Sequence, residues 1–356
     1  MNRRDILLLG SVVFLTFFGL LMIYDASSFV AFRDFSDKYH YVRDQSVWII
    51  LGLIVLFIGS RFDYKRYYNL ALPLLLVSIL FLFLVFVPGI GISALGANRW
   101  VNMGFFILQP SELVKLSLAI YLAAWFSTKE KGRLPAFLLL LSLIIGLIML
   151  QPDMGTASII LAEALAVYFL SGANILHIVG LVPIILLGGL ALIKLEPYRA
   201  TRLSTFLNPD ASLQTTSYHT RQILIALGSG GITGLGFGNS LQKYAYLPEG
   251  TTDSIFAIIA EETGFVGSFF IILIFLAIIW CGFKIAMSAR DTFGKLLAGA
   301  ITVFLGAQII INLSAQTLLL PLTGIPLPFL SYGGSALIVN LFSIGILLNI
   351  SKQGQR

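Results

Sequence analysis

Charged residues and cysteine are scarce in this chain of 356 residues. Asp, Glu, Lys and Arg make up 11% of it, whereas soluble domains carry about a quarter. The lone Cys281 excludes an intrachain disulfide and a cysteine-based metal site. The three histidines (His40, His177 and His219) lack the spacing of a histidine metal site. Neither a Gly-x-Ser-x-Gly elbow nor a Gly-x-x-x-x-Gly-Lys phosphate loop occurs.

Long apolar runs fill the chain instead, and 58% of its residues are hydrophobic. A membrane-spanning helix needs about 20 mostly apolar residues. The runs therefore predict an all-α polytopic membrane protein with ten transmembrane helices and one integral membrane domain over residues 1–356. The first run follows Asn2-Arg3-Arg4 and is interpreted as a span rather than a signal peptide. The expected spans are 6–26, 45–61, 68–88, 108–127, 134–151, 155–171 and 174–193, then 254–283, 295–317 and 332–350.

Cations gather in alternate loops, and cytoplasmic loops collect Lys and Arg. This pattern predicts that both termini are cytoplasmic and that a long exoplasmic loop covers about 194–252. The same bias accounts for the net charge of +6, so nucleic acid is not an expected partner. The cations on the predicted cytoplasmic side are Arg3, Arg4, Arg61, Lys65, Arg66, Lys129, Lys131, Arg133, Lys284, Arg290, Lys295, Lys352 and Arg356.

Ionisable residues inside spans are costly, and each is a functional hypothesis. Glu112 and Lys115 are three residues apart on one helical face, where they can pair. They either form a structural ion pair or line a polar cavity near Arg99 and Gln109 that opens to the exoplasmic side. Glu163 lies within a span with no obvious local partner.

Other polar residues have a structural alternative. Asp153 precedes a span, where it is either a helix N-cap or a catalytic group. Gln308, Asn312 and Gln316 form one stripe, which indicates interhelical hydrogen bonds or, less commonly, a cavity wall. The residues 326–335 interrupt any helix before the last span, and irregular backbone at that depth must be buried or line a cavity.

The stretch from Gly228 to Gly264 is the strongest candidate for chemistry. A glycine run leads through Lys243 to Glu249 and Asp253, at the start of an apolar helix. We predict that Asp253 is the reactive group, although both carboxylates would also favour a helix N-terminal dipole. The glycines do not make a nucleotide site, because no strand-turn-helix surrounds them and the loop is expected outside the cytoplasm.

The same loop is rich in cations. Arg199, Arg202, Arg221 and Lys243 suit an anionic head group such as a phosphate or pyrophosphate. The alternative is that these are solvated charges or that they contact bulk anionic lipid.

Several motifs, in order, resemble the SEDS family (shape, elongation, division and sporulation), which includes RodA and FtsW. The resemblance covers nearly the whole chain, and it slightly favours the FtsW branch because of Pro-Tyr-Arg at 197–199 and Ser-Leu-Gln-Lys at 240–243. The chain departs from the family pattern at Thr251, where that branch often has His, and at Thr263 and Ala336. The motifs are Gly96–Trp100, Gln109–Lys115, Gln151–Thr156, Pro197–Arg199 with Arg202, Leu247–Asp253, Glu261–Glu262 and Leu330–Ser335.

The resemblance implies a peptidoglycan glycosyltransferase in the bacterial cytoplasmic membrane, for cell-wall synthesis in elongation or division. It would polymerise lipid II, a disaccharide-pentapeptide on undecaprenyl pyrophosphate, by inverting transfer with Asp253 as general base. The partners that it suggests are a class B penicillin-binding protein (a transpeptidase) and membrane lipids. A divalent cation (Mg or Mn) is a further candidate, and its ligands are unknown. The expected substrate contacts are Lys243, Arg199, Arg202, Glu249, Ser240, Gln242, Glu112, Lys115, Gln109, Ser111, Arg99 and Asp153.

Two other functions stay open. A lipid II flippase or transporter would use the intramembrane polar residues as its path, and a scaffold would only activate a partner enzyme. An enzyme is favoured because polar groups concentrate on one face and no internal repeat indicates a transporter.

Overall fold

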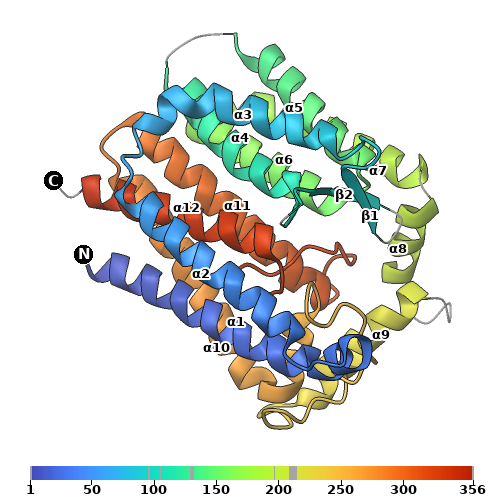
Figure 1. Cartoon of the computed structure of the whole chain (residues 1–356). Coiled ribbons are helices and arrows are strands. Elements are labelled where there is room, and N and C mark those ends of the chain that lie inside the picture. Colours follow the sequence, from blue (N-terminus) through green and yellow to red (C-terminus); the bar gives the residue numbers. More distant parts are fainter. Residues whose placement is uncertain are drawn as a thin grey trace.

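The computed structural model describes residues 2–94, 97–104, 106–128, 132–195, 197–207 and 215–354. Twelve helices and three short strands make up the secondary structure of this part. The long helices form a bundle with both termini at one end, while the strands, α8 and α9 lie at the other (Figure 1). We call these the terminal end and the loop end.

Each of the ten predicted spans overlaps one helix. Six of these helices (α1, α2, α3, α10, α11 and α12) are long and apolar enough to cross a membrane, and α5, α6 and α7 are shorter apolar helices. The break predicted between the spans 155–171 and 174–193 is confirmed, since α6 ends at Leu170 and α7 begins at Ile175. The bounds are α1 (Arg3–Phe35), α2 (His40–Arg61), α3 (Arg66–Leu84), α4 (Pro110–Ser127), α5 (Leu134–Leu150), α6 (Met154–Leu170), α7 (Ile175–Leu195), α10 (Ile255–Ser288), α11 (Thr292–Gln316) and α12 (Gly334–Gly354).

The helices differ in how much of their surface other helices cover. In α11 and α12, 72% of the most apolar window is buried, against 28% in α2 and α3. Large exposed apolar side chains such as Ile54, Phe57 and Leu76 lie on α2 and α3. An apolar surface of this extent suits contact with lipid. The bundle therefore has α11 and α12 at its core and α2 and α3 at its margin.

A small antiparallel sheet, which the sequence analysis did not predict, lies between α3 and α4. It consists of β1 (Gly91–Ala94), β2 (Ala97–Asn102) and β3 (Ile107–Leu108), in that order. Arg99 on β2 donates to the carbonyl of Gln151 at 3.1 Å, just after α5. The sheet is thereby fastened over the loop end of the bundle.

The long loop between α7 and α10 contains two helices, α8 (Pro197–Leu207) and α9 (Thr215–Gly230). The apolar stretch 222–227 is part of α9. The glycine run that follows packs against a kink in α10 at Gly264, where φ is 64°. The backbone amides of Leu235 and Gly236 donate to the carbonyls of Glu261 and Glu262, both at 3.0 Å. The amides of this loop thus bond to carbonyl groups next to the kink in α10.

Contacts at the terminal end join segments that are far apart in the sequence. Arg4 donates to the carbonyl of Lys284 at 3.1 Å, and Gln353 donates to Asp63 at 2.8 Å. The first and last helices and the loops around 63 and 284 therefore meet there. Three of the described residues that were predicted to be cytoplasmic cations, Arg61, Arg290 and Lys352, line one cavity between the last turns of α2 and α12 and the loop after α10.

Candidate active site

Asp253 lies immediately before α10, at the loop end, and its backbone is held by α11. The Asp253 carbonyl accepts hydrogen bonds from Asn312 Nδ2 at 2.9 Å and from Gln316 Nε2 at 2.8 Å. Gln316 also donates to Asn312 Oδ1 at 2.7 Å and accepts from the amide of Ala257 at 2.8 Å. The interhelical hydrogen bonding expected of the polar stripe is confirmed. Its contact with Asp253 was not foreseen.

The segment before α12 supports the same backbone from another direction. The amide of Tyr332 donates to the carbonyl of Thr251 at 2.9 Å, and Ser331 Oγ donates to that of Thr252 at 2.5 Å. Ser331 Oγ in turn accepts from the amide of Leu327 at 2.7 Å. This irregular segment is therefore packed against protein, as its position requires, and it fixes the residues next to Asp253.

The Asp253 carboxylate shares a hydroxyl with a second carboxylate. Thr252 Oγ1 lies 3.1 Å from Asp253 Oδ1 and 2.8 Å from Glu249 Oε2. Glu249 has a left-handed backbone with φ of 52°, a conformation that non-glycine residues adopt mostly under local constraint. This conformation places the two acidic residues on either side of one hydroxyl.

Burial, and then the charge of Glu249, raise the pKa of Asp253 to about 6. The Thr252 hydroxyl and the positive charge of Arg202 act in the opposite direction and are weaker. A general base works best when its pKa lies near the working pH. At pH 7 this carboxylate is ionised and more basic than an exposed Asp.

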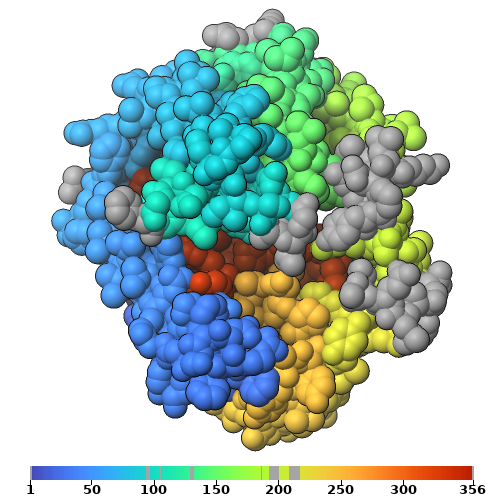
Figure 2. Space-filling model, turned by 45° about the vertical axis from the view of Figure 1, so that its right-hand side comes forward, coloured from blue at the N-terminus to red at the C-terminus, as the bar shows by residue number. Residues whose placement is uncertain are grey.

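The loop end is hollowed. Figure 2 shows a depression whose floor is the red segment around the start of α12, between the teal sheet region and the orange and blue segments. The orange colour includes the start of α10, directly after Asp253. The candidate site therefore adjoins a recess wide enough to be seen in the molecular surface.

Two helices of the long loop contribute groups near Asp253. Arg202 on α8 donates to the carbonyl of Leu322 at 2.6 Å. His219 on α9 hydrogen bonds to Ser254 at 2.8 Å, and burial lowers its pKa to about 4, so it is neutral at pH 7. The side chain of Arg199 lies outside the described residues.

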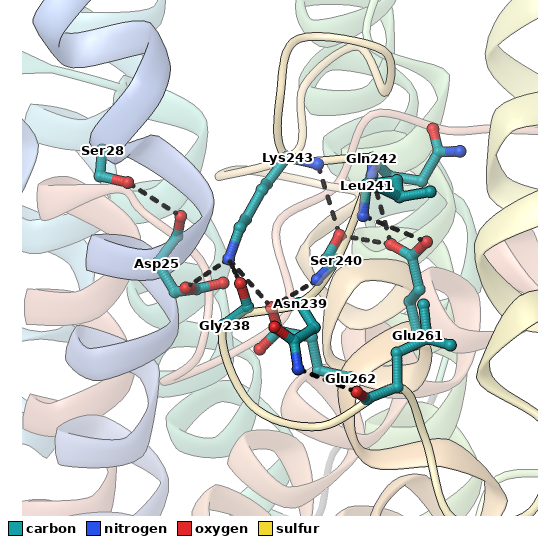
Figure 3. A network of polar contacts seen from close by, with 11 residues as sticks. Asp25, Ser28, Gly238, Asn239, Ser240, Leu241, Gln242, Lys243, Glu261 and Glu262 are labelled. Carbon is teal, nitrogen blue, oxygen red and sulfur yellow. Dashed lines mark hydrogen bonds and ion pairs between the residues drawn. The ribbon is translucent and has the colours of Figure 1, made fainter.

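Lys243 is bound within the protein. Its Nζ lies 2.8 Å from Asp25 Oδ1 on α1, 2.5 Å from the carbonyl of Gly238 and 3.3 Å from Glu262 Oε1 on α10. Figure 3 shows the side chain reaching from its loop toward these partners. Burial favours the neutral amine, but the hydrogen bond and charge of Asp25, together with Glu262, raise the pKa of Lys243 above its usual value. Lys243 is therefore a charged link between the loop, α1 and α10.

Ser240 and Gln242 belong to the same network (Figure 3). The Ser240 hydroxyl donates to Glu261, and its amide donates to Glu262 Oε1 at 3.1 Å. The amide of Gln242 lies 3.4 Å from Glu261 Oε2. The network fastens residues 238–243 to α10 one turn before its kink. Asp25 was missed, although a carboxylate within an apolar span is itself a signal.

The predicted Glu112–Lys115 contact is present. Lys115 Nζ lies 2.9 Å from Glu112 Oε2 and 2.7 Å from Gln308 Oε1, and neither charged side chain is exposed by more than 3%. Gln308 donates onward to the carbonyl of Pro326 at 2.9 Å. The ion pair lies within α4, and Gln308 joins it to α11, so the alternative of a structural role fits these contacts.

The remaining predicted contacts lie on the α4 side of the loop end. The amide of Gln109 lies 3.2 Å from Ser335 Oγ, and Ser111 is buried in the first turn of α4. Asp153 accepts hydrogen bonds from the amide and hydroxyl of Thr156, at 3.0 and 2.8 Å, so the N-cap alternative is confirmed. Of the predicted set, Glu249 and Arg202 are the described residues that act electrostatically on Asp253.

The donors at the site fit a divalent cation only in part. Within the described ranges, no group of three or more His, Cys, Asp and Glu side chains could hold a metal ion. Asp253 and Glu249 supply two carboxylates, and Mg²⁺ is commonly held by one or two carboxylates together with substrate phosphates. A cation bound there would depend on the substrate for further ligands.

Comparison with known proteins gives one consistent result. Residues 5–356 match the protein family described as "Cell cycle protein", which groups FtsW, RodA and SpoVE. A "Probable peptidoglycan glycosyltransferase FtsW" of Geobacter metallireducens is 38% identical over 99% of this chain and 96% of its own length. "Stage V sporulation protein E" of Bacillus subtilis is 38% identical over 98% of this chain and 97% of its own length.

Solved structures agree. The "Rod shape determining protein RodA" of Thermus thermophilus has a TM-score of 0.73 and 28% identity, covering 98% of this chain and 97% of that one. A chain from "Structural coordination of polymerization and crosslinking by a peptidoglycan synthase complex" has a TM-score of 0.81 and 28% identity, covering 98% of each chain.

Proposed function

The chain belongs to the FtsW, RodA and SpoVE family of bacterial membrane proteins, and from this premise we propose that it is a peptidoglycan glycosyltransferase that polymerises lipid II. Asp253 is the general base of the proposed reaction. The relatives that bear the name of this activity match the chain over nearly its full length. Names containing FtsW favour that branch, and therefore a role in division, over the RodA branch.

The proposed topology has ten crossings with both termini in the cytoplasm. The cation-rich loops meet at the terminal end, which is the distribution expected of a cytoplasmic face. The loop end, with Asp253, then faces the exoplasm. The site lies at a membrane boundary, where a lipid-linked sugar can present its pyrophosphate while its tail stays in the bilayer.

In the proposed reaction, Asp253 takes the proton from the attacking hydroxyl of one lipid II or glycan. That oxygen forms a bond to the anomeric carbon of the other, and the bond from this carbon to the pyrophosphate oxygen breaks. Direct displacement inverts an α-linked donor to a β-linked product. A carboxylate with a pKa near 6 accepts this proton more readily than an exposed Asp.

The leaving pyrophosphate requires positive charge. Arg202 is within electrostatic range of Asp253, and we assign it, with Arg199, to the pyrophosphate. A divalent cation, when bound by Asp253, Glu249 and phosphate oxygens, would neutralise the same charge. Lys243 is assigned to organising the loop, because its ammonium is already bound by protein oxygens.

A class B penicillin-binding protein is the proposed partner. A glycan polymerase makes the strands that a transpeptidase cross-links. One structural relative comes from a complex described as coordinating polymerization and crosslinking. The partner therefore would receive product from the loop end.

The observation that carries the proposal is the placement of Asp253. The side-chain amides of Asn312 and Gln316 on α11 hold its backbone, and its surroundings raise its pKa. The test compares wild type with Asp253→Asn in a lipid II polymerisation assay in detergent, with and without Mg²⁺ or Mn²⁺. We expect glycan strands from wild type and a loss of at least about 100-fold in the variant, the range for removing a general base. Asp34→Asn, an exposed carboxylate at the end of α1, is the matched control and should keep full activity.

A transporter is the second candidate, because Lys115 and Glu163 are ionisable groups buried among the helices. Vesicles containing the purified protein and labelled lipid II distinguish the two functions. Transbilayer movement without polymer would favour transport. Polymer made by the single purified chain, and lost in Asp253→Asn, would favour the enzyme and would also exclude a purely scaffolding role.

A further inference from the structure

A second polar cavity lies at the terminal end of the bundle, opposite the candidate active site. Its volume is about 420 Å³, and it lies between the last turns of α2 and α12 and the loop that joins α10 to α11. Three cations line it: Arg61 on α2, Arg290 in the loop and Lys352 on α12. All three are exposed. None of the groups proposed for glycosyl transfer contributes to this cavity.

The lining of the cavity carries more positive than negative charge. Asp63 is the one carboxylate among the lining residues, and its Oδ1 accepts from Gln353 Nε2 at 2.8 Å and from a backbone amide at 3.1 Å. Across the described ranges, none of the three cations lies within 4.0 Å of a carboxylate oxygen. Three like charges around one space favour an anion within it.

A neighbouring carboxylate is also held away from the cations. Asp291 Oδ2 accepts from the Tyr64 hydroxyl at 2.8 Å, and its Oδ1 accepts from the amide of Gly294 at 2.6 Å. The side chain is thus engaged as the N-cap of α11. Neutral hydrogen-bond donors thus hold Oδ1 of Asp63 and both oxygens of Asp291.

Hydrogen bonds between helices hold the wall of the cavity in place. Asn349 is buried, its Oδ1 accepts from the amide of Tyr64 at 3.0 Å, and its Nδ2 donates to the carbonyl of Ser60 at 3.0 Å. Gln353 donates to the same Asn349 oxygen at 3.0 Å. These bonds join α12 to the end of α2, so the cations project from a fixed frame.

Helix dipoles do not account for all three cations. Arg61 and Lys352 lie in the last turns of α2 and α12, where a cation is favourable. Arg290 follows α10 and precedes α11, outside either helix. The bias of cytoplasmic loops toward Lys and Arg accounts for the side of the membrane on which Arg290 is expected, and an anion in the cavity would give the three cations a common partner.

The cavity borders an apolar surface. Phe57 and Ile58 on α2 are 57% and 52% exposed, and the Arg61 guanidinium lies 4.8 Å from the Phe57 ring centre. A ligand with both a phosphate and a hydrocarbon chain would contact the cations and this surface together. Basic pockets between membrane helices are known to bind phosphorylated lipid head groups in this way.

We propose that this cavity binds the phosphate of an anionic phospholipid, with an acyl chain along the exposed face of α2. The proposal concerns the end of the molecule opposite the candidate active site and does not depend on the glycosyltransferase function.

The test measures binding of phosphatidylglycerol to the purified full chain by native mass spectrometry, with phosphatidylcholine as the neutral comparison. Each neutralised cation should weaken phosphatidylglycerol binding about five-fold, so the double variant Arg290→Gln/Lys352→Gln should lose roughly 25-fold. The matched control is Lys284→Gln/Lys295→Gln, which removes two exposed cations from the same end without touching the cavity. It should change binding by less than about two-fold.

Equal losses in the two double variants would overturn the proposal, because they would indicate general attraction to positive charge. Unchanged binding in the cavity variant would overturn it as well. A third arm adds inorganic phosphate: if phosphate alone displaces the lipid at equal concentration, a free anion rather than a phospholipid is the ligand. Melting temperatures of both variants check that the changes leave the fold intact.

Discussion

Replacing Gln316 by Leu tests whether the α11 amides position the reactive group. The change removes three hydrogen bonds, to the Asp253 carbonyl at 2.8 Å, to Asn312 at 2.7 Å and from the amide of Ala257 at 2.8 Å. The Ala257 amide keeps a bond to the carbonyl of Ser254 at 3.0 Å, and the Asp253 carbonyl keeps Asn312 at 2.9 Å. These two groups retain a partner, whereas the buried Asn312 Oδ1 loses its donor, so the loss of stability should be about 1 to 3 kcal/mol rather than the sum of three bonds.

The effect on catalysis should be larger than the effect on stability. Gln316 is buried and acts through Asp253, and a shift of a catalytic group by about 1 Å can cost on the order of 100-fold in rate. We expect kcat for lipid II polymerisation to fall 10- to 100-fold with little change in KM. The pH at which activity reaches half its maximum should also move, because the surroundings of Asp253 change.

The matched control for Gln316→Leu is Asn340→Leu. Asn340 is a buried amide on α12 whose side-chain atoms have no hydrogen-bond partner among the described residues. Replacing it by an apolar side chain of similar size should leave activity unchanged and stability equal or higher. If Gln316→Leu folds with a similar melting temperature and retains full activity and the wild-type pH profile, the positioning role is refuted.

The remaining predictions concern protonation and the loop network. Polymerisation should be lost as the pH falls through about 6, since Asp253 must be ionised to act as a base; a rate that is flat down to pH 5 would contradict this. The same raised pKa means that ionised Asp253 costs stability above about pH 6, at most roughly 3 kcal/mol. Asp253→Asn should therefore melt higher than wild type at pH 7, with the difference shrinking toward pH 4. Lys243→Met should destabilise the protein by about 3 to 5 kcal/mol, because it leaves buried carboxylates uncompensated. Adding Asp25→Asn should recover part of the melting temperature, and no recovery would argue against their ion pair.

The role of the glycine run depends on contacts with α10, about 25 to 30 residues later in the sequence. In the sequence it looked like a flexible loop close to possible phosphate-binding cations. In the structure, its amides meet carbonyls of α10 at the Gly264 kink. Close approach of two backbones requires residues without side chains, so the glycines are explained by packing. The kink then places Glu261 and Glu262 where they hold the loop that carries Lys243.

The sequence by itself determined the ten long helices and the break between α6 and α7, and it offered the cap at Asp153 as one of two alternatives, because apolar runs, turn residues and capping residues act over a few neighbouring positions. It also singled out Asp253, through the charges around it and through family resemblance. It did not determine which polar groups meet. Lys243 pairs with Asp25 across 218 residues, and Gln316 reaches Asp253 across 63. Such contacts depend on how the helices pack, and no local pattern encodes them. Only the tertiary structure therefore decided that Lys243 is a buried link and that α11 holds the backbone of Asp253.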